Sequence, residues 1–244
     1  MNYKAVLQYD GTRYRGWQTQ GNTDNTIQGK LETLLTKMAG EPVEVNGSGR
    51  TDAGVHATGQ VISFRCKTKE SPEEICRHMN EYLPEDIVVL SVEEAAPRFH
   101  ARLNAVRKTY VYRIWNAPVR NVFRRKFTTW IQKPLDLEAM EQAATLLCGT
   151  HDYRAFCSLK KFKKSTVRTI EKIEIGKMGQ EIRISYTGDG FLYHMVRILT
   201  GTLVEVGLGL RKPEEMTEIL EGQDRTKAGR LMPPEGLTLE SVEY

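Results

Sequence analysis

The first ninety residues alternate between strand-like and helix-like spacing of their apolar positions. Apolar and polar residues alternate from Tyr3 to Tyr9, which is typical of a half-buried strand. From Ile27 to Met38 the apolar residues recur on one helix face, after Asn25 or Thr26 as the N-cap and before Gly40 as the end. The chain therefore begins with a strand followed by a helix.

The same alternation continues to about residue 92. Short strand-like runs lie at Val43 to Val45 and at Val61 to Phe64, and Ile87 to Val92 predicts another strand. Before that last strand, the segment 71–74 (Ser-Pro-Glu-Glu) predicts a helix start with a capping box and proline at the first position. The apolar face of this helix is expected to comprise Ile75, Met79, Tyr82 and Leu83. The resulting order, βαββαβ, is the ferredoxin-like split βαβ arrangement.

The rest of the chain repeats this order. The predicted elements are a strand at Lys108 to Trp115, a helix near Leu137 to Leu147, a hairpin joining Val167 to Ile175 with Ile182 to Tyr186 through a turn near Met178 and Gly179, an apolar helix from Phe191 to about Val206, a short helix after Pro213, and a strand within Leu237 to Tyr244.

We therefore predict an α+β fold with two ferredoxin-like, RRM-like halves, whose mainly antiparallel sheets pack around a central RNA-binding cleft. Residues 1–105 form the N-terminal half and residues 106–244 the C-terminal half, with no low-complexity linker between them. Open sheets of this kind often present aromatic side chains to bases. The same topology serves many unrelated functions, so the fold alone leaves the function open.

Composition excludes several classes of protein. The four cysteines lack CxxC spacing and the five histidines stand alone, so neither a disulfide framework nor a metal site is indicated. No apolar run approaches the roughly 18 residues of a membrane span, and the N-terminus has the pattern of a strand instead of a signal peptide. A cytoplasmic protein fits best.

Positive charge is mild overall, at +4, but is clustered locally. Two basic groups have phenylalanines between their cations: Arg120, Arg124, Arg125 and Lys126 with Phe123 and Phe127, and Lys160, Lys161, Lys163, Lys164 and Arg168 with Phe162. Each group could neutralise phosphates or could be a solvated, charged loop.

A glycine-rich loop from Asn46 to Gln60 is the most unusual stretch of the chain. Glycines allow close approach of the backbone to a ligand, so Asp52 in this loop could reach a substrate held over the sheet. Alternatively, Asp52 only bonds nearby backbone amides in a long turn. The Walker spacing of a phosphate loop is absent.

The segment GRTDAGVHATGQV, which contains Asp52, resembles the signature of the tRNA pseudouridine synthase I family, of the TruA type. Further matching segments are YDGTRYRGWQTQ (9–20), FHARLNAVRKTYVYRI (99–114), GTHDYRAFCS (149–158), GFLYHMVRILTGTLVEVGLG (190–209) and the ending PPEGLTLESVEY. Together they span nearly the whole chain in the family's order.

This resemblance implies an isomerase that converts uridines at about positions 38, 39 and 40 of the tRNA anticodon stem-loop into pseudouridine. It implies a homodimer with tRNA as partner, and neither a cofactor nor a metal, because the reaction has no redox step. Asp52 matches the catalytic aspartate. Its carboxylate suits attack on carbon or stabilisation of an oxocarbenium-like sugar, and the sequence leaves open whether it acts at C1′, C6 or C2′.

Two further residues match the family's active site. Arg197 matches the arginine that pairs with the aspartate; it lies roughly 140° round the predicted helix from Leu192, off the apolar stripe, so a surface arginine is the alternative. Tyr110 matches the tyrosine that stacks on the target base. Core packing is the alternative for Tyr110, and Tyr112 shares its face of the strand.

Other matches concern substrate binding. Arg50 resembles an arginine that fills the space of the flipped base, with phosphate contact as the alternative. His56 fits a structural hydrogen bonder better than an acid or base. Asp10, Arg15, Trp17 and Gln18 are expected to face RNA or to order their loop, and Lys160, Lys161, Lys163 and Lys164 are candidates for phosphate contact.

The sequence departs from the family pattern at two places, Met232-Pro233-Pro234 and Val111, and these were expected to affect RNA contacts more than chemistry. Two other functions compete with the isomerase. A noncatalytic RNA-binding protein of the same fold would not need Asp52 or Arg197. A glycosidase or nucleoside hydrolase would release free uracil, but Asp52 has no acidic partner nearby in the sequence.

Overall fold

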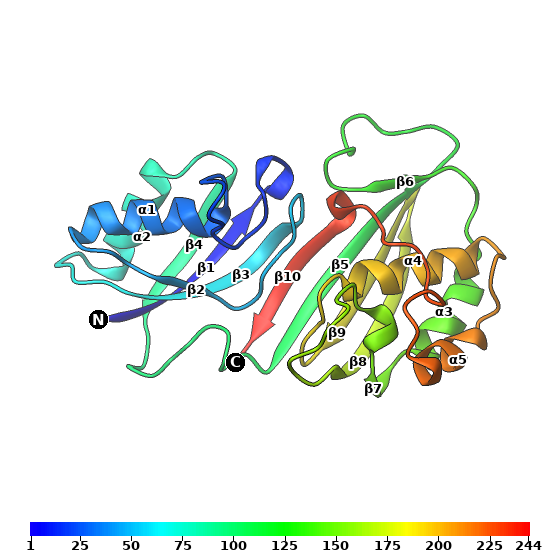
Figure 1. Ribbon diagram of the computed structural model, residues 1–244. Helices are drawn as coiled ribbons and strands as arrows, with labels where there is room; N and C mark the ends of the chain where they lie inside the picture. The colour runs from blue at the N-terminus through cyan, green and yellow to red at the C-terminus, as the bar shows by residue number, and fades with distance from the viewer. The chain divides into compact units, whose positions relative to one another are not determined.

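The computed structural model describes all 244 residues, and the chain divides into two compact units (Figure 1). Unit 1 comprises residues 1–106 and 238–244, and unit 2 comprises residues 107–237. The last seven residues thus cluster with the unit in which the chain began, although the sequence pattern placed them in the second half. No helix is long and apolar enough to cross a membrane.

Unit 1 is a sheet with two helices. Its elements are β1 (Asn2–Tyr9), the 3-10 helix η1 (Gly11–Arg13), α1 (Ile27–Ala39), β2 (Val45–Gly47), β3 (His56–Arg65), α2 (Pro72–Tyr82), β4 (Ile87–Glu94) and most of β10 (Leu237–Glu243). The strand order is β4-β1-β3-β10; β2 also pairs with β3. All pairs are antiparallel except β10 with β3. The predicted βαββαβ order is confirmed.

The predicted helix boundaries of unit 1 follow from their caps. The Thr26 side chain accepts a hydrogen bond from the Gly29 amide, and Gly40 ends α1 in the left-handed conformation at φ 69°. Ser71 and Glu74 form the predicted capping box of α2. One position was wrong: Tyr82 is 63% exposed and lies against the His78 ring, because α2 ends there and its last turn extends beyond the core.

Unit 2 contains β5 (Arg107–Asn116), β6 (Thr129–Ile131), α3 (Leu137–Leu146), β7 (Gly149–Asp152), η2 (Arg154–Phe156), β8 (Val167–Met178), β9 (Glu181–Gly188), α4 (Met195–Gly207), α5 (Glu215–Gly222) and η3 (Pro234–Gly236). The strand order is β5-β9-β8-β7, all antiparallel, with β6 parallel to β5. The predicted hairpin is confirmed, with Gly179 at φ 61° in its turn. Strands β6 and β7 are too short to show a period in the sequence.

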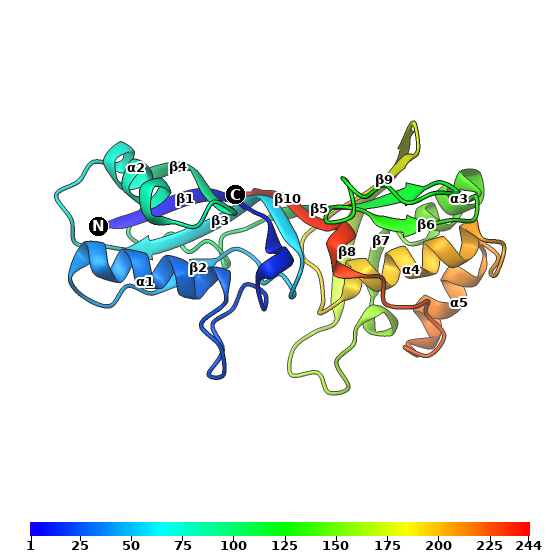
Figure 2. The same ribbon diagram turned by 90° about the horizontal axis from the view of Figure 1, so that it is seen from above.

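Helix α4 differs from its prediction at its start. It begins at Met195 instead of Phe191, because His194 has a left-handed backbone with φ 65° that a helix cannot continue through. Twelve of its thirteen residues are buried. The segment 228–232 covers the side away from the sheet and approaches so closely that a Cβ on Gly201 would lie 1.9 Å from the Arg230 carbonyl oxygen. On the sheet side, the Thr200 hydroxyl of α4 lies 2.8 Å from the Tyr186 hydroxyl of β9, and Figure 2 shows α4 along the sheet of its own unit.

Candidate functional site

Asp52 lies in the loop between β2 and β3, where a tight turn fixes its backbone. The Asp52 carbonyl accepts a hydrogen bond of 3.1 Å from the Val55 amide, and Gly54 adopts φ 79° within that turn. The side chain of Asp52 is half-buried. The aspartate is therefore held on an ordered turn next to the start of β3, at the edge of the unit 1 core.

The segment 10–18 supports this turn from one side. The Trp17 amide donates to the Thr51 carbonyl over 2.9 Å. Gly16 has φ +100°, and a Cβ there would lie 3.0 Å from that same carbonyl oxygen. A Cβ on Gly11 would lie 2.0 Å from the Val55 carbonyl oxygen. Only glycine at positions 11 and 16 allows the two backbone segments to approach so closely.

A network of buried hydrogen bonds also holds the residues that precede the turn. The Tyr9 hydroxyl lies 2.8 Å from the Thr51 hydroxyl. Gln60 receives a hydrogen bond of 2.7 Å from Ser48 and donates one of 3.0 Å to the Gly49 carbonyl. Burial raises the pKa of Tyr9 far above its ordinary value, so this hydroxyl keeps its proton. These bonds fix the residues on both sides of Arg50.

His56 and Asp10 lie beside the turn. The Gly11 amide donates to His56 Nδ1 over 3.1 Å, while Asp10 Oδ1 lies 3.3 Å from the same nitrogen. A backbone amide can only donate, so Nδ1 acts here as an acceptor and the 3.3 Å contact is not an ion pair. Asp10 instead accepts from the Thr12 amide over 2.9 Å as the cap of η1. Both residues hold the loop, as expected of His56.

The remaining candidates in the segment 9–20 differ in how exposed their side chains are. Trp17 is 2% exposed, and its indole packs against Gly47. Arg15 and Gln18 are exposed. Trp17 therefore lies inside the loop, whereas Arg15 and Gln18 lie on its surface.

Arg50 is exposed on unit 1 and has a second arginine in its neighbourhood. Partial burial, together with the positive charge of Arg102, lowers the pKa of the Arg50 guanidinium. Sequence reasoning did not single out Arg102, although its motif, FHARLN, was among the matching segments. Two like charges near each other create a positive potential that favours an anion.

On unit 2, Tyr110 and Tyr112 share one face of β5 but have different surroundings. Tyr112 is fully buried, and its hydroxyl bonds Thr129 Oγ1 at 2.6 Å and the Pro233 carbonyl at 2.7 Å. Tyr110 is 8% exposed, with its ring edge-on to Phe191 at 5.3 Å between centroids. The structure therefore assigns Tyr112 to the core and leaves Tyr110 at its edge.

Arg197 is a buried arginine in the first turn of α4, and only 8% of it is exposed. Its Nε donates to the Met232 carbonyl over 2.7 Å, and the Met232 amide donates back to the Arg197 carbonyl over 3.3 Å. The expectation that Arg197 lies off the buried stripe was wrong, because the segment 228–232 covers that side of α4. Burying a cation is costly, so a surface arginine is no longer an alternative.

The segment Met232-Pro233-Pro234, where the sequence departs from the family pattern, contacts both Arg197 and Tyr112. Met232 is fully buried against Arg197, and the Pro233 carbonyl holds the Tyr112 hydroxyl. Burial raises the pKa of Tyr112, while the nearby charges of Arg197 and Arg230 act to lower it. This segment holds the Arg197 side chain through the backbone of Met232, whose own side chain is buried.

Helix α4 is also connected to the lysine-rich loop. His194, at the start of the helix, lies 2.9 Å through Nδ1 from the Ser158 hydroxyl, and the Ser158 amide donates to the Tyr193 carbonyl. The lysines that follow Ser158 are exposed and make no ion pair: Lys160, Lys161, Lys163 and Lys164. Phe162 lies under the Arg154 guanidinium at 5.3 Å.

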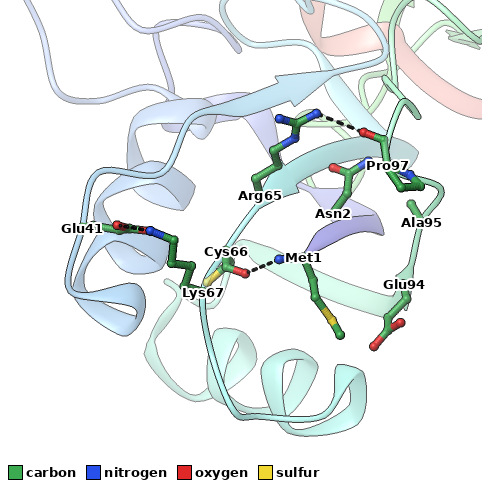
Figure 3. Close-up of a pocket in the computed structure, with 9 residues that line it drawn as sticks. All are labelled: Met1, Asn2, Glu41, Arg65, Cys66, Lys67, Glu94, Ala95 and Pro97. Carbon is green, nitrogen blue, oxygen red and sulfur yellow. Dashed lines mark hydrogen bonds and ion pairs between the residues drawn. The ribbon is translucent and has the colours of Figure 1, made fainter.

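The other features of the chain lie apart from these residues. No three His, Cys, Asp or Glu side chains come together as metal ligands. A cleft of about 600 Å³ lies where Asn2 of β1 pairs with Arg65 of β3, at the opposite end of these strands from Asp10 and His56. Figure 3 shows the residues that line this cleft, among them the Lys67–Glu41 ion pair and the Arg65–Pro97 hydrogen bond.

Comparison with known proteins gives a consistent result. A family model described as tRNA pseudouridine synthase matches residues 5–104 and 143–244. A protein of Bacillus sp. (strain KSM-64), "tRNA pseudouridine synthase A", is 48% identical over 243 residues, which cover 100% of this chain and 99% of that protein.

Two other comparisons differ greatly in strength. A protein of the same name from Brevibacillus brevis is 46% identical over 99% of this chain and 98% of its own length. Among solved structures, a Cbf5-Nop10-Gar1 complex is similar over 83% of this chain and 45% of that chain, with a TM-score of 0.39 and 12% identity.

Proposed function

Because this chain belongs to the tRNA pseudouridine synthase family, we propose that it isomerises uridines at about positions 38, 39 and 40 of the tRNA anticodon stem-loop. The family's activity is an intramolecular isomerisation. The N1–C1′ bond of uridine breaks, the base turns, and a C5–C1′ bond forms. C5 then loses its proton and N1 gains one, so atoms and electrons balance without a redox partner.

Asp52 is the proposed catalytic carboxylate. The observation that supports this role is the turn at residues 52–55, which Gly11, Gly16 and the Tyr9–Thr51 hydrogen bond hold in one conformation. A carboxylate fixed in this way acts on the sugar or the base with little loss of entropy in the transition state. An aspartate that merely bonded its own turn would not require such support from two other segments.

Arg197 and Tyr110 are the proposed partners of Asp52 from unit 2. Arg197 is buried and its Nε donates to the Met232 carbonyl, which orients a guanidinium that can form a charge-assisted bond to a carboxylate. Tyr110 is the proposed platform for the flipped base, since its ring packs edge-on against Phe191 and belongs to a rigid strand. In this proposal unit 1 carries the acid, and unit 2 carries the tyrosine and the arginine.

The other candidates bind the RNA. Arg50, with Arg102 beside it, would occupy the space of the flipped base or contact a phosphate, and Arg15 and Gln18 would contact the backbone. The exposed lysines 160, 161, 163 and 164 would neutralise phosphates. We place the enzyme in the cytoplasm as a homodimer, in agreement with its free cysteines and the location of its substrate.

The test is release of tritium from tRNA labelled at uridine C5, with wild-type protein and with Asp52→Asn, without added cofactor or metal. We expect release by the wild type alone, with tRNA binding by the variant largely preserved. Release of free uracil would indicate a nucleoside hydrolase. Tight binding of tRNA without any tritium release would indicate the noncatalytic RNA-binding function.

A further inference from the structure

The loop between β5 and β6, residues 117–128, presents the most exposed aromatic ring of the chain. Phe123 at its tip is 92% exposed, and Val119 and Val122 are 75% and 59% exposed. Exposed apolar side chains that gather on one loop, and not singly, mark a binding surface. We call these residues the Phe123 loop.

The Phe123 loop is ordered at its base and at its tip. Two tryptophans anchor the base: the Trp130 indole donates to the Ala117 carbonyl over 2.9 Å, and the Trp115 indole donates to the Val119 carbonyl over 3.0 Å. At the tip, the Asn121 side chain accepts from the Phe123 amide over 3.0 Å. The ring is thus displayed at little further cost in entropy when a partner binds.

The charge of the Phe123 loop indicates which partner fits. It contains Arg120, Arg124, Arg125 and Lys126 and no acidic residue. Glu181 of β9 contacts the loop and is shared between Arg124 at 2.8 Å and Arg113 at 3.8 Å. An exposed ring among cations suits RNA, because a base stacks on the ring while the arginines contact phosphates. A second copy of the chain fits less well, since a two-fold interface would bring the same cations together.

The Phe123 loop lies far from the proposed base-binding tyrosine of the same unit. It leaves β5 after Asn116, six residues beyond Tyr110, which is roughly 20 Å along the strand. The lysine-rich loop instead lies near the start of β5. It precedes β8, and Ile170 near the start of β8 is joined through Gly188 of β9 to Lys108 near the start of β5. Figure 1 shows the two loops at opposite ends of the unit 2 sheet.

We propose that the Phe123 loop is a second RNA-docking surface, which stacks Phe123 on a base of the folded tRNA remote from the target uridine. This inference rests on the proposed function for the identity of the RNA. The loop then adds affinity for whole tRNA without taking part in the chemistry. An isolated anticodon stem-loop lacks the remote base and gains nothing from Phe123.

The test compares Phe123→Ala with Leu210→Ala, a control that removes an apolar side chain of similar exposure (71%) from another loop of unit 2. For each variant, kcat and KM are measured by C5 tritium release on whole tRNA and on its isolated anticodon stem-loop. Equilibrium binding is measured in an Asp52→Asn background, in which no turnover occurs. Far-UV circular dichroism and light scattering report folding and subunit number.

We expect Phe123→Ala to weaken binding of whole tRNA roughly 5- to 100-fold, the usual effect of losing one aromatic stacking partner. The kcat value and the stem-loop affinity should match those of the wild type and of Leu210→Ala. The double variant Arg124→Gln/Arg125→Gln should lower the salt dependence of whole-tRNA binding by up to about two units of slope, one for each phosphate contact.

Three outcomes would overturn the proposal. Unchanged affinity for both RNAs would show that Phe123 binds no base, and equal losses for both would place its partner within the stem-loop. A change in subunit number with preserved folding would show that the loop contacts a second copy of the chain. If the wild type releases no tritium from any tRNA, the proposed isomerase fails, whereas the binding measurement still decides the docking surface.

Discussion

The close contact between Gly16 and the Asp52 turn gives the sharpest test of the site that does not alter a reacting group. Gly16 has φ +100°, and a Cβ there would meet the Thr51 carbonyl oxygen at 3.0 Å and the Ala53 amide nitrogen at 3.2 Å. Gly16→Ala therefore adds backbone strain and also pushes on the turn. Gly40→Ala is the matched control, because Gly40 has φ +69° and nothing lies within 4 Å of its Cβ position.

The two substitutions separate strain from displacement. Placing alanine at positive φ costs about 1–2 kcal/mol of unfolding free energy, which both variants should lose. At Gly16 the neighbouring backbone must also move by a few tenths of an ångström. A misplacement of about 1 Å costs on the order of 100-fold in rate, so a shift of half that size should lower kcat by roughly tenfold. Gly40→Ala should keep the wild-type kcat.

The assays are kcat for C5 tritium release under saturating tRNA and unfolding free energy from urea titration. If Gly16→Ala keeps the wild-type kcat while losing as much stability as Gly40→Ala, the turn at residues 52–55 does not position a catalytic group. If Gly40→Ala also loses activity, the lower kcat reflects general destabilisation and the reasoning fails in the same way.

Three further predictions follow from the structure. Arg197→Lys keeps the charge but loses the Nε donor to the Met232 carbonyl, so activity should fall at least about tenfold and the unfolding free energy by about 1–3 kcal/mol. The control Arg211→Lys should stay active, and equal activities of the two variants would refute the positioning role of Arg197. Burial raises the pKa of Tyr9 and Tyr186, so above about pH 10 these tyrosines lose their protons in the unfolded state but keep them in the folded state. Urea titrations should therefore show the unfolding free energy falling by up to about 1.4 kcal/mol per pH unit for each tyrosine. Tyr186→Phe should reduce this slope, and an unchanged slope would contradict the assignment. Replacing lysines 160, 161, 163 and 164 by alanine should flatten the salt dependence of tRNA binding by about one unit of slope for each phosphate contact, and an unaltered slope would identify a merely solvated loop.

Local patterns in the sequence predicted most elements of both units. The helix at residues 27–39 follows from its apolar spacing, the Thr26 cap and the left-handed Gly40, all of which act within a few residues. The capping box at Ser71 and the hairpin at Gly179 are equally local. The strands β6 and β7 escaped prediction because three or four residues show no period, and they exist through pairing with β5 and β8.

The candidate residues illustrate the same division. Asp52, Tyr110 and Arg197 were found through motifs, but their surroundings were not. Sequence alone could not separate Tyr110 from Tyr112, since both face the same side of β5; the hydrogen bonds of Tyr112 to Thr129 and Pro233 do so. It also placed Arg197 outside the core, because the residues that bury it lie more than thirty positions further along the chain.

The sequence by itself thus determined most of the elements, the ends of α1, the start of α2 and the family, because these depend on neighbouring residues or on recurring motifs. Only the tertiary structure decided that Met232 holds Arg197, that Gly11 and Gly16 hold the Asp52 turn, and that the final strand pairs with β3. These contacts join residues distant in sequence, and their strength depends on close packing and burial. No local period carries that information.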